Sequence, residues 1–204
     1  MTIQRIKISN TGENMDEALS LTEKAAKDMS LSLRDTLRLR LLAEEMMSMV
    51  RAIASSFTAH FCLEHEGKSC KLVLSAKSEL DYGKRSEFLS VSTTGKNTAK
   101  VGIMEKIRGI FEAGLYGMEQ SFAAQAEYGV GMYSAGMMGA VDAGMTEAIY
   151  SWSMQKYRNE VESKRTEYPD VWDELEKSII ANLADEVSVG VTKDGVELTV
   201  QKNF

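Results

Sequence analysis

Apolar side chains recur every three or four residues in four parts of the chain, and this period predicts amphipathic helices. The predicted helices cover residues 15–29, residues 32–53, a stretch that begins at Ile103, and residues 172–183. Ser32 and Asp35 have the spacing of a capping box, which indicates that the second helix begins at Ser32. The only proline of the chain, Pro169, precedes the last of these helices.

Strands are predicted where apolar and polar residues alternate, or where β-branched residues cluster. These stretches are residues 3–8, 57–64, 69–76, 88–91, 186–191 and 196–201. The short link at residues 66–68 predicts a β-hairpin, and the Lys-Asp-Gly turn at residues 193–195 predicts another. We therefore expect an α+β fold, a two-layer α/β sandwich in which helices cover one face of a mixed, mostly antiparallel sheet.

Residues 112–168 differ from the rest of the chain in composition, since glycine, alanine and methionine are concentrated there. Small residues such as Gly131, Ala135 and Gly139 recur every four positions, which on a helix allows close approach of backbones. We expect a single domain over residues 1–204 in which residues 112–168 form a helical insertion. Two interpretations stay open: a tight helix pair or mobile loop within the chain, or a surface for a protein partner or a homodimer.

Composition and charge exclude several classes of protein. The chain is 44% hydrophobic and 26% charged, which is ordinary for a domain with a buried core. Its net charge of −6 argues against nucleic acid as a partner. No apolar run reaches the length of a membrane span, and the N-terminus lacks the apolar region of a signal peptide. We therefore expect a cytoplasmic protein with no membrane partner.

The cysteines and histidines of the chain lie close together in two predicted strands. Cys62 and Cys70 are the only cysteines, and His60 and His65 are the only histidines. On an extended strand residues 60 and 62 share a face that residue 65 does not, which disfavours a common metal ion. We assign no metal to these four residues, whereas a Cys62–Cys70 disulfide across the hairpin stays open.

Carboxylates interrupt the apolar helix of residues 32–53. Glu44 and Ser48 stand on one face with the i, i+4 spacing, and Arg51 follows one turn later. Two interpretations are open for this group. Glu44 is either a functional carboxylate that activates water or supports a metal, or part of a solvent-exposed edge with Arg–Glu pairs, for example between Glu45 and Arg38.

A glycine-containing turn at Gly95, Lys96 and Asn97 is followed by a second glycine, Gly102, that opens the helix beginning at Ile103. Glycine allows close backbone approach, lysine supplies positive charge, and free N–H groups at a helix start point outward, so the segment can hold an anion. It is not a P-loop, because Ser90 occupies the first glycine position and Asn97 follows the lysine.

The order strand, helix, glutamate-bearing helix, hairpin, glycine turn, helix and terminal hairpin resembles the GHKL ATP-binding superfamily. The likeness is to its anti-sigma-factor-type serine kinases and histidine-kinase-like ATPase domains. Residues 41–51 resemble the N-box helix, in which a glutamate activates the attacking water and an asparagine four residues later holds Mg²⁺. The resemblance implies that Glu44 is the catalytic base and that Ser48 takes the place of the Mg²⁺-binding asparagine.

The segment that ends at Gly102 resembles the ATP lid of that superfamily, which implies that Gly95, Lys96, Asn97 and Gly102 contact the phosphates. Asp81 is the partial match to the Asp-x-Gly-x-Gly box, whose aspartate reads the adenine amino group. The resemblance covers residues 1–111 and 172–204. The whole chain is also similar to bacterial proteins described as ATP-binding, which share Ser-x-x-Gly-Lys-Asn and Trp-Asp-Glu-Leu-Glu-Lys segments.

The resemblance implies a Bergerat-like fold and an adenine-nucleotide-binding regulatory protein, with ATP or ADP and Mg²⁺ as ligands. Phosphoryl transfer depends on metal positioning, so the serine at position 48 and the incomplete adenine box imply a degenerate site with weak or absent turnover. Two alternatives are a non-catalytic protein-interaction module that kept the fold and lost the nucleotide, and an anti-sigma-type serine protein kinase.

Overall fold

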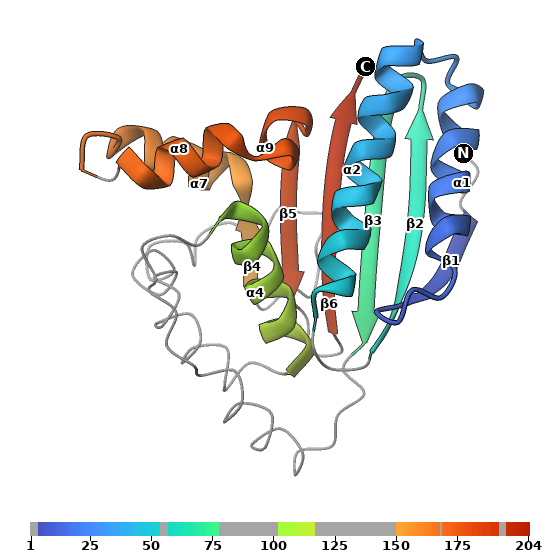
Figure 1. Ribbon diagram of the computed structural model, residues 1–204, viewed down its shortest axis with the longest axis horizontal. Helices are drawn as coiled ribbons and strands as arrows, with labels where there is room; N and C mark the ends of the chain where they lie inside the picture. The colour runs from blue at the N-terminus through green and yellow to red at the C-terminus, as the bar shows by residue number, and fades with distance from the viewer. Residues whose placement is uncertain (1–3, 54–56, 78–101, 117–149, 168, 192–194) are drawn as a thin grey trace.

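The fold is built from six strands and six helices within the residues that the computed structural model describes (Figure 1). These residues are 4–53, 57–77, 102–116, 150–167, 169–191 and 195–204. In chain order the elements are β1 (Gln4–Ser9), α1 (Met15–Asp28), α2 (Leu33–Arg51), β2 (Thr58–Glu66), β3 (Ser69–Lys77), α4 (Ile103–Tyr116), β4 (Tyr150–Ser153), α7 (Met154–Ser163), α8 (Pro169–Lys177), α9 (Ile179–Leu183), β5 (Glu186–Val191) and β6 (Gly195–Asn203).

The six described strands form one open sheet in the order β1-β2-β3-β6-β5-β4, and each pairing in it is antiparallel. Both predicted hairpins are present, as β2–β3 and β5–β6. They meet at the centre of the sheet, where Leu74 of β3 lies opposite Leu198 of β6. The expected α+β class and antiparallel sheet are confirmed, although no parallel pairing occurs among the described strands.

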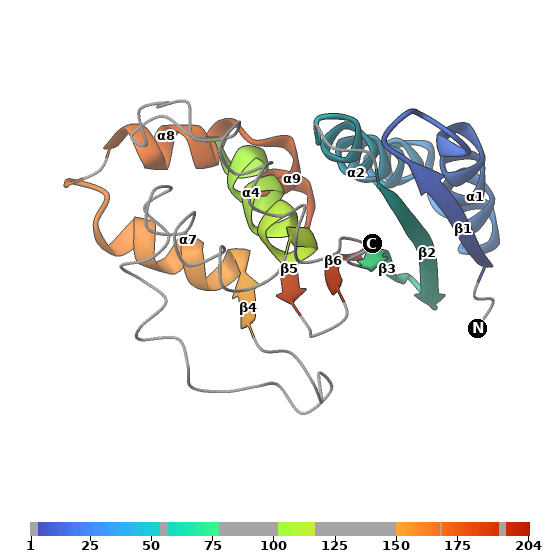
Figure 2. The same cartoon turned by 90° about the horizontal axis from the view of Figure 1, so that it is seen from below.

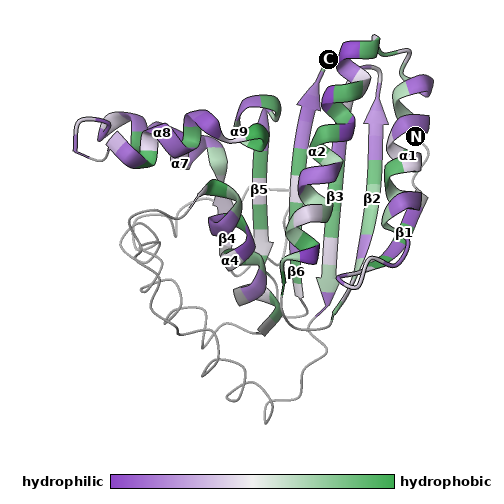
Figure 3. Cartoon of the chain, in the orientation of Figure 1, coloured by the Kyte–Doolittle hydropathy of each residue, from purple (hydrophilic) through white to green (hydrophobic). Residues whose placement is uncertain are grey.

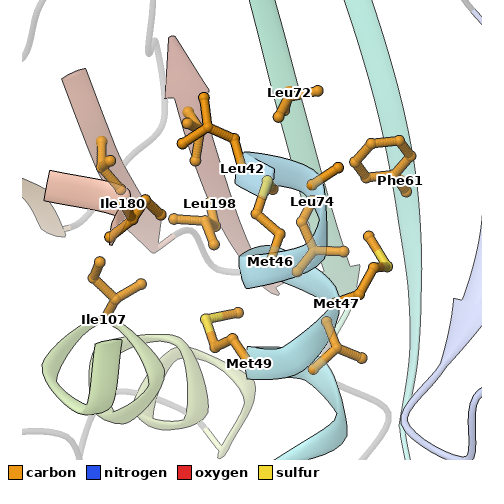
Figure 4. Packing of buried hydrophobic residues seen from close by; sticks show 14 of the residues in the cluster. Leu42, Met46, Met47, Met49, Phe61, Leu72, Leu74, Ile107, Ile180 and Leu198 are labelled. Carbon is orange, nitrogen blue, oxygen red and sulfur yellow. The ribbon is translucent and has the colours of Figure 1, made fainter. Parts of the chain in front are cut away.

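Helices α1, α2, α4 and α9 lie on the same face of the sheet, which makes two layers (Figure 2). The strands alternate, so that every second side chain enters the space beneath these helices. Phe61, Leu74 and Leu198 are fully buried there. Figure 4 shows Leu42 and Met46 of α2 directed into the same cluster, beside Leu74 and Leu198. Helix α2 thus covers the centre of the sheet and packs against α1, α4 and α9.

Helix α2 begins as the capping box predicts. The Ser32 hydroxyl accepts a hydrogen bond from the Asp35 backbone N–H at 3.2 Å and donates one to the Asp35 carboxylate at 2.7 Å. This pair satisfies an N–H group that would otherwise lack a partner at the helix start.

The single helix predicted over residues 172–183 is wrong, since the structure has two helices, α8 and α9. Ser178 separates them in an extended conformation, and its hydroxyl accepts a hydrogen bond from the Ala181 backbone N–H at 3.4 Å. A serine side chain competes with the helical backbone for hydrogen bonds and favours a helix start. Pro169 is the first residue of α8 rather than a residue before it, a position where a missing N–H is tolerated.

Strand β4 and helix α7 lie within the range predicted as an insertion, and the sequence pattern predicted no strand there. Trp152 of β4 lies opposite Val189 of β5 and is buried. The Glu186 carboxylate joins this edge to β5, because it accepts hydrogen bonds from the Ser153 hydroxyl at 3.1 Å and from the Met154 N–H at 3.0 Å. The small-residue stripes of residues 131–144 and the predicted strand at residues 88–91 lie outside the described residues.

Asp185 fixes the C-terminal end of β6 to the start of β5. Its carboxylate accepts hydrogen bonds from the Lys202 ammonium at 2.7 Å, from the Asn203 backbone N–H at 2.7 Å and from the Asn203 side-chain amide at 3.0 Å. Partial burial alone would raise the pKa of Asp185, but the bonds to Lys202 and Asn203 outweigh it and hold this pKa below its usual value.

We expect the Asp185→Asn variant to be less stable than the wild type at pH 7 and equally stable in strong acid. A carboxylate with a lowered pKa contributes stability above its unfolded-state pKa and loses that contribution as the pH falls through the folded-state pKa. The difference should therefore close below about pH 4. Urea unfolding of both proteins between pH 7 and pH 2.5 measures it, and a difference that stays constant over this range would contradict the assignment.

Candidate functional site

Glu44 lies in an ion-pair cluster between α1 and α2. Its carboxylate accepts a hydrogen bond from the Arg40 Nε at 2.8 Å, and the same guanidinium contacts the Glu23 carboxylate of α1. The three side chains are each about two-fifths exposed. These contacts correspond to the Arg–Glu edge considered from the sequence. Arg38, which was expected to pair with Glu45, instead pairs with Asp35 at 3.1 Å.

Ser48 and Arg51 continue along α2 from Glu44. Ser48 is exposed and its hydroxyl makes no hydrogen bond to a described residue. The Arg51 Nε lies 3.0 Å from the Met15 sulfur of α1, so this side chain also points to the α1 side. The residues taken from the N-box resemblance therefore lie at the solvent and α1 sides of α2, away from α4.

Glu45, rather than Glu44, lies on the side of α2 that is turned toward α4. It stands one helical turn before Met49, and Figure 4 shows Met49 between α2 and α4, near Ile107. Burial, and then the negative charge of Glu44, raises the pKa of the Glu45 carboxyl group. In the sequence, the i, i+4 spacing to Ser48 favours Glu44 as the functional carboxylate, whereas the i, i+4 spacing to the apolar Met49 is the signal that points to Glu45.

The start of α4 lies beside α8. The Gly102 carbonyl accepts the first helical hydrogen bond, from the Lys106 N–H at 3.1 Å. A Cβ atom added to Gly102 would be 3.9 Å from the Glu174 carboxylate of α8. The structure therefore brings Gly102 close to Glu174 and leaves Glu44 on the other side of α2.

Lys106 places a half-buried positive charge in the first turn of α4. Its ammonium lies 5.1 Å from the centre of the Tyr157 ring, which is within the range of a cation–π interaction. The Tyr157 ring in turn lies 6.0 Å from the Trp152 ring. Burial lowers the pKa of Lys106, and no carboxylate among the described residues lies within ion-pair distance of it. The sequence analysis did not single out Lys106.

Four predicted ligand residues lie outside the described part of the chain. These residues are Asp81, Gly95, Lys96 and Asn97. Their contacts with adenine and phosphates stay predictions.

The described residues do not fit an Mg²⁺ ion held at Ser48. Mg²⁺ in proteins is bound by carboxylates with water and substrate oxygens. The Glu44 carboxylate is occupied by Arg40, and within the described ranges no group of three His, Cys, Asp or Glu side chains could hold a metal ion.

The two cysteines are free thiols on opposite faces of the sheet. Cys62 lies opposite Val73, whereas Cys70 lies opposite His65 and in the core beneath the helices. The disulfide that the sequence left open is therefore absent. Burial raises the pKa of Cys70 to about 12, so this thiol stays protonated near neutral pH.

Within the ranges that the structure describes, no helix combines the length and the apolar character needed to cross a bilayer. No protein-family model, no curated protein and no solved structure matches the chain.

Proposed function

We propose that the chain is a GHKL-type regulatory domain that binds an adenine nucleotide with little or no turnover. The supporting observation is the packing of α4 against α2 on the helix-covered face of an antiparallel sheet. Helix α4 begins directly after the segment that contains Gly95, Lys96 and Asn97. A Bergerat-like pocket would lie between these two helices, with its phosphate contacts in that segment.

Two features of the candidate site favour binding over catalysis. Glu44 is held by Arg40, and a carboxylate in an ion pair is a poor proton acceptor for an attacking water. Ser48 has no carboxylate cluster beside it, and phosphoryl transfer depends on a positioned metal ion.

Calorimetric titration with ATP and with ADP, each with and without Mg²⁺, tests nucleotide binding directly. We expect saturable heat with both nucleotides and a small effect of Mg²⁺. The Lys96→Ala variant should bind about tenfold to a hundredfold more weakly, because it loses a charge-assisted contact to phosphate. Lys24→Ala, at an exposed position of α1, makes the same charge change and should bind like the wild type.

Three results, two from these titrations and one from an activity assay, would contradict the proposal. Absence of heat at millimolar nucleotide would leave the alternative of a protein-interaction module that lost the ligand. Equal weakening by Lys24→Ala would show that binding follows net charge rather than a site. Steady ATP hydrolysis would contradict the proposal of little or no turnover. Transfer of labelled phosphate to a protein substrate would favour the alternative of a serine protein kinase.

Residual hydrolysis, if it is measurable, separates the two adjacent glutamates. Glu45 is turned toward α4, and burial raises the pKa of its carboxyl group above the usual value, which makes it a better proton acceptor than an ion-paired carboxylate. Glu45→Gln should then abolish the residual rate, whereas Glu44→Gln should leave most of it, because the amide can still accept a hydrogen bond from Arg40. The opposite order would restore Glu44 as the base implied by the family resemblance.

A further inference from the structure

Helix α2 carries an apolar ridge on the side opposite to the core. Leu33, Leu37 and Leu41 are 79%, 53% and 40% exposed, and they are spaced four residues apart. We call these three residues the leucine ridge. Residues at this spacing are neighbours on a helix surface, so the three side chains form one continuous strip. Figure 3 shows hydrophobic and hydrophilic turns alternating along α2, which lies in front of the sheet.

The leucine ridge lies outside the buried core of the described chain. The buried side of α2 is formed by other residues, among them Leu42 and Met46, so this helix is apolar on two sides. Ile179 of α9, a helix that packs against α2, is also 45% exposed. Single exposed leucines are common, but a contiguous row of them marks an interaction site.

The charges at the two ends of the leucine ridge are opposite in sign. Arg34 lies at its N-terminal end and has no carboxylate within ion-pair distance among the described residues. Glu44 and Glu45 lie just beyond its C-terminal end. Arg34 and Glu45 are eleven residues apart, which on a helix is about 16 Å.

We propose that the leucine ridge binds a second copy of this chain, with the two α2 helices antiparallel. A two-fold axis near the middle of the ridge would set Leu37 against Leu41 of the partner subunit. The same axis would place Arg34 beside Glu44 of the partner subunit and Glu45 of the partner subunit. Each contact occurs twice by symmetry.

Opposite charges at the two ends favour a second copy over an unrelated helix. The ridge has a positive charge at its N-terminal end and negative charges at its C-terminal end. Two copies therefore bring opposite charges together only when their helices run antiparallel, which is the arrangement that a two-fold axis gives. Helices whose i, i+4 rows interdigitate cross at a defined angle, which a regular leucine row permits. Association can be measured in the absence of nucleotide, because the three leucines face solvent and not α4, whereas Glu45 at the end of the ridge lies on the side turned toward α4.

The dimer should be weak. One helix pair with a neighbouring isoleucine covers less than the roughly 800 Å² per partner of a stable interface. We therefore expect a dissociation constant on the order of 10–100 µM, measured on the full chain by sedimentation velocity over a concentration series. Addition of 0.5 M NaCl should weaken association, because the end contacts are ionic.

Substitutions in the ridge test the interface, and a charge change elsewhere provides the control. Leu37→Glu should weaken association by at least about a hundredfold, because it buries a carboxylate against the apolar Leu41 of the partner subunit in each of the two symmetric contacts. Lys27→Glu, on the exposed side of α1, should leave the dissociation constant unchanged. Far-UV circular dichroism should show that both variants keep the wild-type fold.

A charge exchange tests the antiparallel arrangement itself. Arg34→Glu and Glu45→Arg should each weaken association by about tenfold, and the double variant should recover the wild-type value. Failure of the double variant to recover would overturn the antiparallel pairing. A wild-type chain that stays monomeric at 300 µM would overturn the proposal and leave the ridge to a different protein, and a dimer that survives Leu37→Glu would overturn it as well.

Discussion

Replacement of Phe61 by alanine should lower the free energy of unfolding by about 3–5 kcal/mol, which is a large fraction of the stability of an ordinary domain. Phe61 is fully buried in β2, where it lies opposite Ile6 of β1 and Leu74 of β3. Its ring fills the space between these strands and α2, and Figure 4 shows it near Met47. Denaturation by urea, followed by far-UV circular dichroism, measures the change.

The adjacent residue on β2 supplies a matched control. His60 points to the opposite face of the sheet, where no described helix lies, and it stands between Lys7 and Ser75 on the neighbouring strands (Figure 2). We expect His60→Ala to change the free energy of unfolding by no more than about 0.5 kcal/mol. An equal decrease in the free energy of unfolding for the two variants would contradict the assignment of Phe61 to the helix-covered face of the sheet and of His60 to the opposite face.

Most of the fold could be predicted because each major element has a regular period and a clear start or turn. The strands of the β2–β3 hairpin bury Ala59 and Phe61, and Leu72 and Leu74, at alternate positions, and the turn between them lies at Gly67, which has a positive φ of 56°. Helix α2 has its cap at Ser32 and one dominant buried side. In these segments the local propensity of the residues and the burial in the fold favour the same secondary structure, so the sequence pattern alone predicts the element.

The missed elements are those whose structure depends on distant residues. Strand β4 has only four residues, of which Trp152 is buried, so its period is too short to detect. Its strand partner is Val189, and its link to Glu186 is a hydrogen-bond network that no local pattern encodes. At Ser178 the chain could either continue one helix or begin a second one with Ser178 as its N-cap. Tertiary packing determines which of the two forms, so the local sequence does not predict the break.

The sequence places both glutamates of the candidate site on α2, but it does not show which side of the helix each one occupies. Glu44 and Glu45 differ by about 100° around the helix axis. The sequence shows that both interrupt an apolar helix, whereas the neighbours decide their environments. Helix α1 supplies Glu23 to the cluster of Glu44, whereas Glu45 stands one turn before Met49, which lies between α2 and α4. Spacing to a buried residue therefore indicates the orientation of Glu45, which spacing to a polar residue does not.

Gly114→Ala should destabilise the protein by about 1–3 kcal/mol, even though alanine is the better helix former. Helix α4 crosses the β5–β6 hairpin at this glycine, directly over Val191 and Val196, which lie opposite each other in the sheet. A Cβ atom on residue 114 would be 2.7 Å from the Val196 Cβ and 3.1 Å from a Val191 methyl group. Both valines are buried and β-branched, so they cannot move aside easily.

The other glycine of α4, Gly109, distinguishes the effect of the steric contact at Gly114 from the effect of helix propensity. A Cβ atom on Gly109 would meet nothing within 4 Å, so Gly109→Ala should stabilise the protein by up to about 1 kcal/mol. The two variants carry the same chemical change on one helix and should move the urea midpoint in opposite directions. If both raised it, α4 would not rest on the hairpin at Gly114. Because the proposed pocket needs α4 in place beside α2, Gly114→Ala should also weaken ATP binding in calorimetry, whereas Gly109→Ala should not.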